Sequence, residues 1–138
     1  MSRASAGIVL EASRRYEDEI ARRQANAQRL IQVVRELNAF QVIVPPAGAS
    51  AGYLRLPLLV SSSVRAAAIR PEARRLGVMP GYPVPLHRLK GFESRVANLS
   101  RPMPGAEMLA ERLITLPVHG LMTERDLKAL EQWVRHQA

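Results

Sequence analysis

The sequence contains no cysteine among its 138 residues. This absence excludes a disulfide framework, a thiolate nucleophile and every zinc site that depends on cysteine. Aromatic residues make up only 4% of the chain, so nucleic-acid bases would find few platforms for stacking. No apolar run approaches the roughly 20 residues that span a bilayer, and the first residues lack the pattern of a secretory signal. We therefore expect a cytoplasmic protein without a membrane segment.

Acidic residues are scarce: the chain has 12 acidic and 20 basic residues, which gives a net charge of +8. Such an excess raises nucleic acid as a partner. The basic residues are 18 arginines, scattered along the chain, and the lysines Lys90 and Lys128. A GC-rich coding sequence gives the same arginine-rich, lysine-poor composition. Nucleic-acid binding is therefore the less favoured interpretation of the charge.

Residues 13–37 have the spacing of one long amphipathic helix, with acidic residues near its start that complement the helix dipole. A small sheet cannot cover a helix of this length. We expect the second half of its apolar stripe to seal the sheet, and the first half to pack less closely against it. The first half comprises Tyr16, Ile20 and Ala27, and the second half Ile31, Val34 and Leu37.

Two strands are predicted after this helix, at residues 40–44 and 53–60. A Pro/Gly-rich loop separates them, which favours an antiparallel hairpin. Pro57 lies inside the second strand and lacks an N–H group. It therefore predicts that this strand lies at a sheet edge or carries a bulge.

The rest of the chain alternates helical and extended patterns. Ser61–Ser63 is a helix entry, and Pro71 either kinks the helix that follows or opens a second one. Residues 78–89 are extended but too rich in proline for a central strand. A short helix at 104–113, a short strand at 114–118 and a last helix from Thr123, which has a capping box with Asp126, complete the order. This order predicts an α/β (α+β) fold in which helices cover one face of a small antiparallel or mixed sheet.

Catalytic and metal-binding motifs are missing. The sequence has no HExxH pattern, no GxSxG elbow and no phosphate-binding glycine loop. His87, His119 and His136 are too far apart for a metal site, and Glu107 is interpreted as complementing the dipole of its helix. Prolines fix the backbone direction of Tyr82 and His87, which makes these two residues candidates for a site. A purely structural role for them stays equally open.

Four short segments in the second half of the chain together resemble a known protein family. They are Tyr82-Pro-Val-Pro-Leu-His87, Pro104-Gly-Ala-Glu107, Leu113-Ile-Thr-Leu-Pro117 and Met122-Thr-Glu-Arg-Asp126. In this order and spacing they resemble the C-terminal part of the DegT–DnrJ–StrS family of pyridoxal-phosphate-dependent sugar aminotransferases. The earlier half resembles the interdomain helix and first strands of the same small domain more loosely.

The resemblance implies a small domain like the C-terminal domain of fold-type I aminotransferases, with residues 1–138 as one domain and residues 38–138 as its α/β body. It implies that a large domain, absent here, holds pyridoxal phosphate on a lysine. Neither Lys90 nor Lys128 matches that lysine's motif, so the chain alone is expected to be inert and to bind no cofactor. A homodimer and a nucleotide-linked keto-sugar substrate are also implied.

The resemblance also implies that His87, with Tyr82 beside it, lies near the substrate. The family's pattern continues with Leu-Gln-x-x-Tyr, whereas here His87 is followed by Arg88-Leu-Lys-Gly. Two other classes of function remain. One is a small basic interaction module without enzymatic activity that binds nucleic acid, and the other is a small stand-alone enzyme, for which the sequence offers no catalytic constellation. Which sugar and which amino donor are used is left open.

Overall fold

The computed structural model describes residues 2–92, 95, 97 and 101–137. Its helices are α1 (Arg3–Arg14), α2 (Tyr16–Arg35), α3 (Ser62–Ala68), α4 (Pro71–Arg75), α5 (Pro104–Arg112) and α6 (Glu124–Arg135), with a short 3₁₀ helix η1 (Leu86–Arg88). Its strands are β1 (Phe40–Val42), β2 (Arg55–Val60), β3 (Met79–Pro80) and β4 (Leu113–Pro117). No described helix is both long and apolar enough to cross a membrane.

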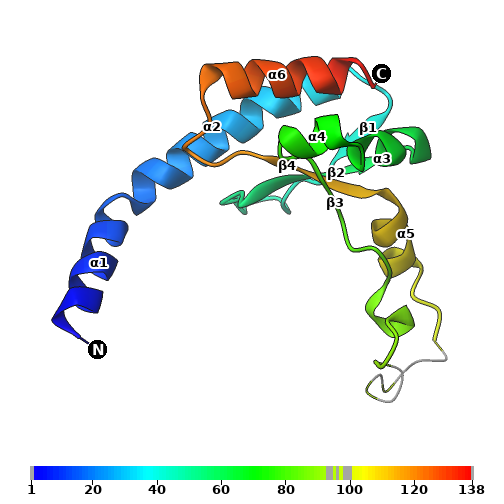
Figure 1. Ribbon diagram of the computed structural model, residues 1–138, viewed down its shortest axis with the longest axis horizontal. Helices are drawn as coiled ribbons and strands as arrows, with labels where there is room; N and C mark the ends of the chain where they lie inside the picture. The colour runs from blue at the N-terminus through cyan, green and yellow to red at the C-terminus, as the bar shows by residue number, and fades with distance from the viewer. Residues whose placement is uncertain (1, 93–94, 96, 98–100, 138) are drawn as a thin grey trace.

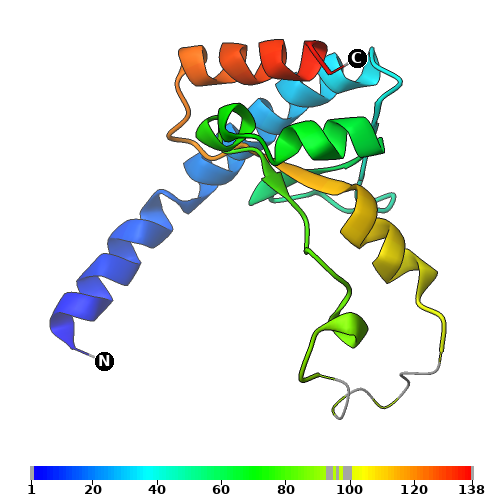
Figure 2. The same ribbon diagram turned by 45° about the vertical axis from the view of Figure 1, so that its right-hand side comes forward.

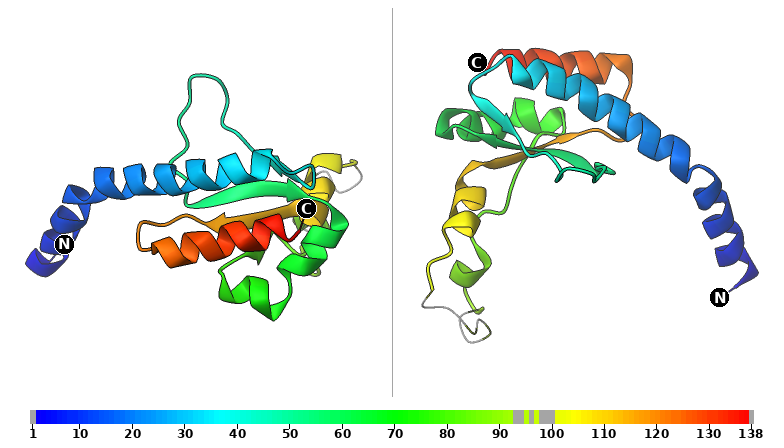
Figure 3. Two further views of the ribbon diagram at one scale, coloured as in Figure 1. Left: turned by 90° about the horizontal axis from the view of Figure 1, so that it is seen from above. Right: turned by 180° about the vertical axis from the view of Figure 1, so that it is seen from behind.

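The described strands form one antiparallel sheet in the order β1-β2-β4-β3. Alternate residues of β2 point to opposite faces of the sheet. Leu56, Leu58 and Val60 are fully buried on one face, together with Ile114 and Leu116 of β4. Helices α2 and α6 lie side by side over that face (Figures 1 and 3), and α3 and α4 contribute to the same core. The predicted small sheet with helices on one face is therefore confirmed, in its antiparallel form.

The hairpin and the helix signals are also confirmed. β1 and β2 pair with Phe40 opposite Val60, and the loop between them projects from the body (Figure 3). The Ser61 side chain caps α3, and Pro71 opens α4 as a separate helix. Gly77 ends that segment with φ of +76°, a conformation that glycine adopts at little cost. Thr123 and Asp126 form the predicted capping box of α6.

The first helix begins earlier than predicted. The helical segment starts at Arg3 in place of residue 13, because the Ser2 side chain accepts a hydrogen bond from the N–H of Ser5 and so caps α1. Arg15 separates α1 from α2, and its N–H bonds to the carbonyl of Ala12, three residues back. The two helices meet at a bend there, and α1 projects away from the body (Figures 1 and 2).

The prediction that Pro57 places its strand at an edge or a bulge is wrong. β2 lies between β1 and β4, and its register with β4 continues through the pair of Pro57 and Thr115. The carbonyl of Pro57 accepts from the N–H of Ile43 at 3.3 Å, beyond the last registered pair with β1. The backbone of Pro57 therefore faces β1 where the registered pairing has ended, and its missing N–H removes no bond to β4.

The expectation for the long helix is corrected at two residues, Ala27 and Leu37. Tyr16 is exposed and Ile20 is half-buried, as expected for the first half of the stripe. Ala27, however, is fully buried, and Leu37 is only half-buried. The cause is α6, which lies beside α2 and adds a second surface to the sheet, so that the buried part of α2 extends from Ala27 to Val34.

Candidate functional site

The segment that carries Tyr82 and His87 leaves the sheet directly after β3. The N–H of Gly81 donates to the carbonyl of Leu113 at 2.6 Å, which holds the segment against β4. A Cβ atom at Gly81 would lie 2.9 Å from the Cβ of Leu113, closer than van der Waals contact permits. Pro83 and Pro85 then restrict the backbone, and η1 places His87. The segment extends away from the sheet beside α5 (Figure 2).

A pocket of about 430 Å³ lies between this segment and α5. Tyr82 and His87 both line it, and most of the remaining lining is apolar, from Val84 to Leu86 and from Met103, Ala106, Leu109 and Ala110. Tyr82 is 73% exposed, whereas the His87 side chain is only 12% exposed. The structure thus brings the two residues predicted from the sequence into one pocket. A largely apolar cleft with few polar groups is the usual form of a small-molecule site.

His87, which lines this pocket, also belongs to a cluster of three charged or titratable side chains. His87 Nε2 lies 3.5 Å from Glu107 Oε1, and the same oxygen accepts a hydrogen bond from Arg88 Nη2 at 2.6 Å. Glu107 belongs to the first turn of α5, where the helix dipole favours a carboxylate. The sequence predicted only that Glu107 complements the dipole of its helix, and its contact with His87 was not predicted. The signal that could have indicated this contact is that Glu107 lies in the segment Pro104-Gly-Ala-Glu107, one of the four that resemble the family.

The other two histidines lie elsewhere. His119 is in the turn before α6, and its carbonyl accepts from the N–H of Met122. His136 caps the C-terminal end of α6, with Nδ1 2.7 Å from the carbonyl oxygen of Gln132. Among the described residues, no three side chains of His, Asp or Glu gather as metal ligands. His87 is therefore the histidine that the fold places in a pocket with the predicted Tyr82.

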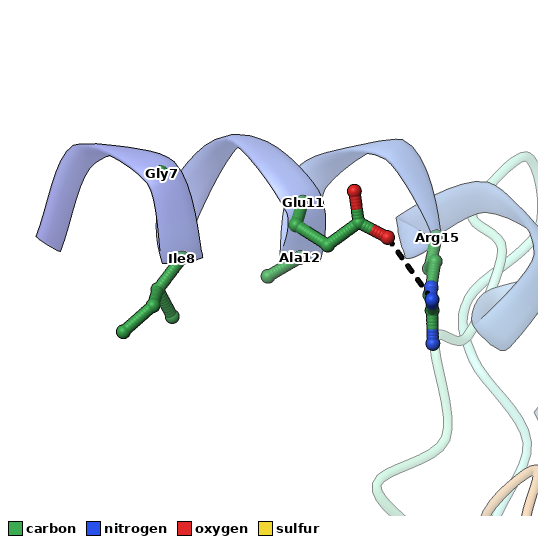
Figure 4. Close-up of a pocket in the computed structure, with 5 residues that line it drawn as sticks. All are labelled: Gly7, Ile8, Glu11, Ala12 and Arg15. Atoms are coloured by element: carbon green, nitrogen blue, oxygen red, sulfur yellow. Dashed lines mark ion pairs between the residues drawn. The ribbon is translucent and has the colours of Figure 1, made fainter. Parts of the chain in front are cut away.

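A second hollow lies along α1, lined by Gly7, Ile8, Glu11, Ala12 and Arg15 (Figure 4). Glu11 and Arg15 form an ion pair at 3.0 Å, and Ile8 and Ala12 point to one side of the helix. All five residues come from this helix and its C-terminal cap, so no second element among the described residues walls the hollow. Ligand sites are concave, and we assign no small-molecule site here.

The pattern of the DegT/DnrJ/EryC1/StrS aminotransferase family matches residues 1–135. The chain belongs to this family. The family is generally dependent on pyridoxal phosphate. Among proteins with curated descriptions, none matches the chain significantly.

Several solved structures have the same fold as this chain. The aminotransferase TlmJ from Streptoalloteichus hindustanus is 28% identical, with a TM-score of 0.72 over 90% of this chain and 33% of TlmJ. DesV from S. venezuelae is 17% identical, with a TM-score of 0.80 over 95% of this chain and 35% of DesV. Helicobacter pylori PseC, an aminotransferase of pseudoaminic acid biosynthesis, is 14% identical, with a TM-score of 0.73 over 93% and 35%. The chain thus spans about a third of the length of each.

Proposed function

We propose that this chain is the C-terminal small domain of a pyridoxal-phosphate-dependent sugar aminotransferase. The observation that carries the proposal is the extent of the similarity: 90% of this chain aligns with 33% of the aminotransferase TlmJ at 28% identity. A chain of this length corresponds to one domain of such an enzyme, and the remaining part would supply the cofactor site. PseC takes part in the biosynthesis of pseudoaminic acid, which supports a sugar as the amino acceptor, and we expect a nucleotide-linked keto-sugar in the cytoplasm.

The described residues do not fit pyridoxal phosphate. The cofactor is held as a Schiff base on a lysine amine, and this chain has only Lys90 and Lys128. Both lysines are exposed, and neither lines the pocket of Tyr82 and His87. Lys128 pairs with Glu124 on the surface of α6, at 3.7 Å. We therefore propose that the lysine and the other cofactor contacts belong to a large domain, on the same polypeptide or on a separate one.

The pocket between residues 82–87 and α5 is the part of this domain that we assign to the substrate side. Its apolar walls suit the ring face of a sugar or base, and His87 is a polar residue in its lining. Tyr82 adds a hydroxyl at the exposed rim. On this proposal, the domain binds and orients substrate while the large domain carries out amino transfer.

Helix α1 is the surface that we assign to the large domain or to the second subunit of a homodimer. Ile8, Val9 and Leu10 are 71%, 59% and 56% exposed. Helix α1 projects away from the sheet and from the helices that cover it (Figure 1). Apolar side chains this exposed on a projecting helix favour packing of that helix against another protein surface.

The test compares this chain alone with the chain joined to the polypeptide encoded directly upstream of it. The joined protein is expected to bind pyridoxal phosphate, to show the absorbance of a lysine-bound cofactor and to transfer an amino group to a nucleotide-linked keto-sugar. The chain alone is expected to give no stoichiometric, borohydride-trapped adduct at Lys90 or Lys128. A trapped adduct in the chain alone, or an upstream polypeptide without a cofactor lysine, would overturn the proposal.

A further inference from the structure

The two walls of the pocket, residues 82–88 and α5, are joined where both meet the sheet. The first wall begins after Gly81, whose N–H donates to the carbonyl of Leu113 at 2.6 Å. Leu113 is the C-cap of α5, the second wall. A Cβ atom at Gly81 would lie 2.9 Å from the Cβ of Leu113, so the two backbones lie close together at this end. From here both walls extend away from the sheet (Figure 2).

An ion pair joins the walls again at their far end. Arg88, the last residue of η1, donates from Nη2 to Glu107 Oε1 at 2.6 Å. Glu107 lies in the first turn of α5, about 9 Å along the helix axis from Leu113 at a rise of about 1.5 Å per residue. Among the described residues, the polar contacts between residues 82–88 and α5 all end on Glu107, from Arg88 and, at 3.5 Å, from His87 Nε2.

Arg88 and Glu107 bridge the walls without lining the pocket. Their neighbours in sequence, His87 and Ala106, do line it. The two bridging side chains are 60% and 36% exposed. An ion pair in contact with water is weak, and salt weakens it further. This contact can therefore break and form again while the domain stays folded.

We propose that the ion pair of Arg88 and Glu107 is a clasp that holds the two walls of the pocket at the spacing that binds substrate. Both residues are then positioning residues, because they act through the walls and touch no ligand. When the clasp is open, the joint at Gly81 and Leu113 remains and the far ends of the walls separate. A pocket that is closed for only part of the time binds its ligand more weakly in that proportion. The identity of the substrate rests on the proposed function, whereas the clasp rests on the contacts within this chain.

The first experiment measures the spacing of the walls in the full chain and needs no substrate. The chain has no cysteine, so two introduced cysteines can carry the only spin labels. Lys90→Cys and Glu111→Cys place the labels at exposed positions outside the pocket lining, one just beyond the first wall and one on α5. Pulsed double electron–electron resonance is expected to give one narrow distance distribution at low salt. At about 500 mM salt, which screens exposed charges, the distribution should broaden towards longer distances.

Neutral variants of the labelled chain test whether this ion pair sets the spacing. Arg88→Gln and Glu107→Gln are each expected to give the broad distribution already at low salt. The double variant should be no broader than either single variant, because the effects of two partners in one contact do not add. Arg135→Gln is the matched control, since it removes a similarly exposed ion pair, with Glu36 at 3.0 Å, elsewhere in the domain. It should keep the narrow distribution.

Three results would overturn the clasp. The first is a wild-type distance distribution that is the same at low and high salt, and this measurement requires no substitution of the clasp. The second is a folded Arg88→Gln chain that keeps the narrow distribution. The third is equal broadening in Arg135→Gln, which would show that the spacing follows the general stability of the domain.

The second experiment uses the protein joined to its cofactor-binding part, with a nucleotide-linked keto-sugar as the probe. Each single variant is expected to raise KM about threefold while kcat changes by less than about twofold, because a smaller closed fraction weakens binding of the substrate and of its transition state equally. The ratio of variant to wild-type KM should fall towards one as salt rises, because salt also opens the wild-type clasp. An unchanged KM in variants whose walls have separated would overturn the proposal. A joined protein without any transfer activity would refute the proposed function and leave the distance result standing.

Discussion

The guanidinium group of Arg29 joins α2 to α6 through a two-pronged contact with Glu124. Nη1 lies 2.6 Å from Oε2 and Nη2 lies 2.9 Å from Oε1, while Nε donates to Glu131 at 2.5 Å. This geometry uses the planar fork of arginine, which lysine lacks. These hydrogen bonds raise the pKa of Arg29 and lower that of Glu124. Arg29 thus ties together the two helices that cover the sheet, in addition to the ion pair between Arg135 of α6 and Glu36 at the end of α2.

Replacement of Arg29 by lysine tests this tie. Arg29→Lys is expected to lower the midpoint of chemical denaturation modestly, because a lysine amine cannot serve both carboxylates with the same geometry. The loss should be smaller than that of a core truncation, since exposed ion pairs contribute little. Arg125→Lys, at an exposed position of α6, is the matched control and should leave the midpoint unchanged. An equal loss in both variants would contradict the role of the fork.

Truncation of the buried part of α2 is expected to cost far more than truncation of α1. Leu30 is fully buried against the sheet and α6, whereas Ile8 is 71% exposed. Leu30→Ala should lower the free energy of unfolding by about 2–5 kcal/mol, the range for a buried leucine. Ile8→Ala should change it by less than about 0.5 kcal/mol in the isolated chain. Urea denaturation of both variants measures the difference, and a large loss at Ile8 would mean that α1 is covered in the isolated chain.

Some features of this fold are encoded locally, and the sequence predicts them. Thr123 and Asp126 lie three residues apart in the pattern of a capping box, and the start of α6 follows from these two side chains alone. Pro71 likewise sets the start of α4. The positions of Pro57 and Ala27 depend on elements distant in the chain. A proline is tolerated in central β2 because β1 ends beside it, and Ala27 is buried because α6 lies against α2.

The residues of the candidate site also differ in whether the local sequence predicts them. Tyr82 and His87 are found from the sequence because they lie in one proline-rich segment that resembles the family's. Glu107 lies about twenty residues further along the chain, and only the fold brings its carboxylate to His87 and Arg88. The sequence around Glu107 therefore predicts only that it complements the dipole of its own helix. The cluster of His87, Arg88 and Glu107 therefore depends on the tertiary fold.

Gly81 is expected to be the glycine least tolerant of alanine near the site. A Cβ there would lie 2.9 Å from Leu113 Cβ and 3.0 Å from its Cδ2, so the segment would have to move away from β4. Gly81→Ala should cost about 1–3 kcal/mol, as overpacking does. Gly105→Ala in α5 is the control, because a Cβ there meets nothing within 4 Å, and it should gain about 0.4–1 kcal/mol. Thermal and urea denaturation measure both, and a neutral Gly81→Ala would mean that the segment is free to shift.

Stability is expected to fall on the acid side. Hydrogen bonds from Thr123 lower the pKa of Asp126, and contacts with Arg23 and the N–H of Gly120 lower that of Glu19. A carboxyl group whose pKa is lower in the folded state stabilises the fold above its unfolded pKa, and this contribution is lost as pH falls through the folded value. The free energy of unfolding should therefore stay level from about pH 7 to pH 5 and decline below about pH 4.5. Thr123→Val should weaken the decline, and an unchanged decline in that variant would show that Thr123 does not hold the pKa of Asp126 down.

Binding of nucleic acid is expected to be weak in spite of the net charge of +8. Much of the arginine charge is engaged within the fold: Arg14, Arg15, Arg23, Arg29, Arg75, Arg88 and Arg135 form ion pairs with acidic side chains. Arg55, Arg65 and Arg112 donate to backbone carbonyls. These cations are held in place by the protein's own oxygens, and phosphate would have to compete with them.

Affinity that comes only from phosphate contacts falls steeply with salt. Fluorescence anisotropy with labelled duplex DNA and with single-stranded RNA is therefore expected to detect binding at about 20 mM salt and to lose most of it at about 150 mM. The affinity should be the same for unrelated sequences, because few aromatic side chains are present to stack on bases. Submicromolar, sequence-selective binding at the higher salt would instead support a basic interaction module and weaken the assignment of this chain to an aminotransferase.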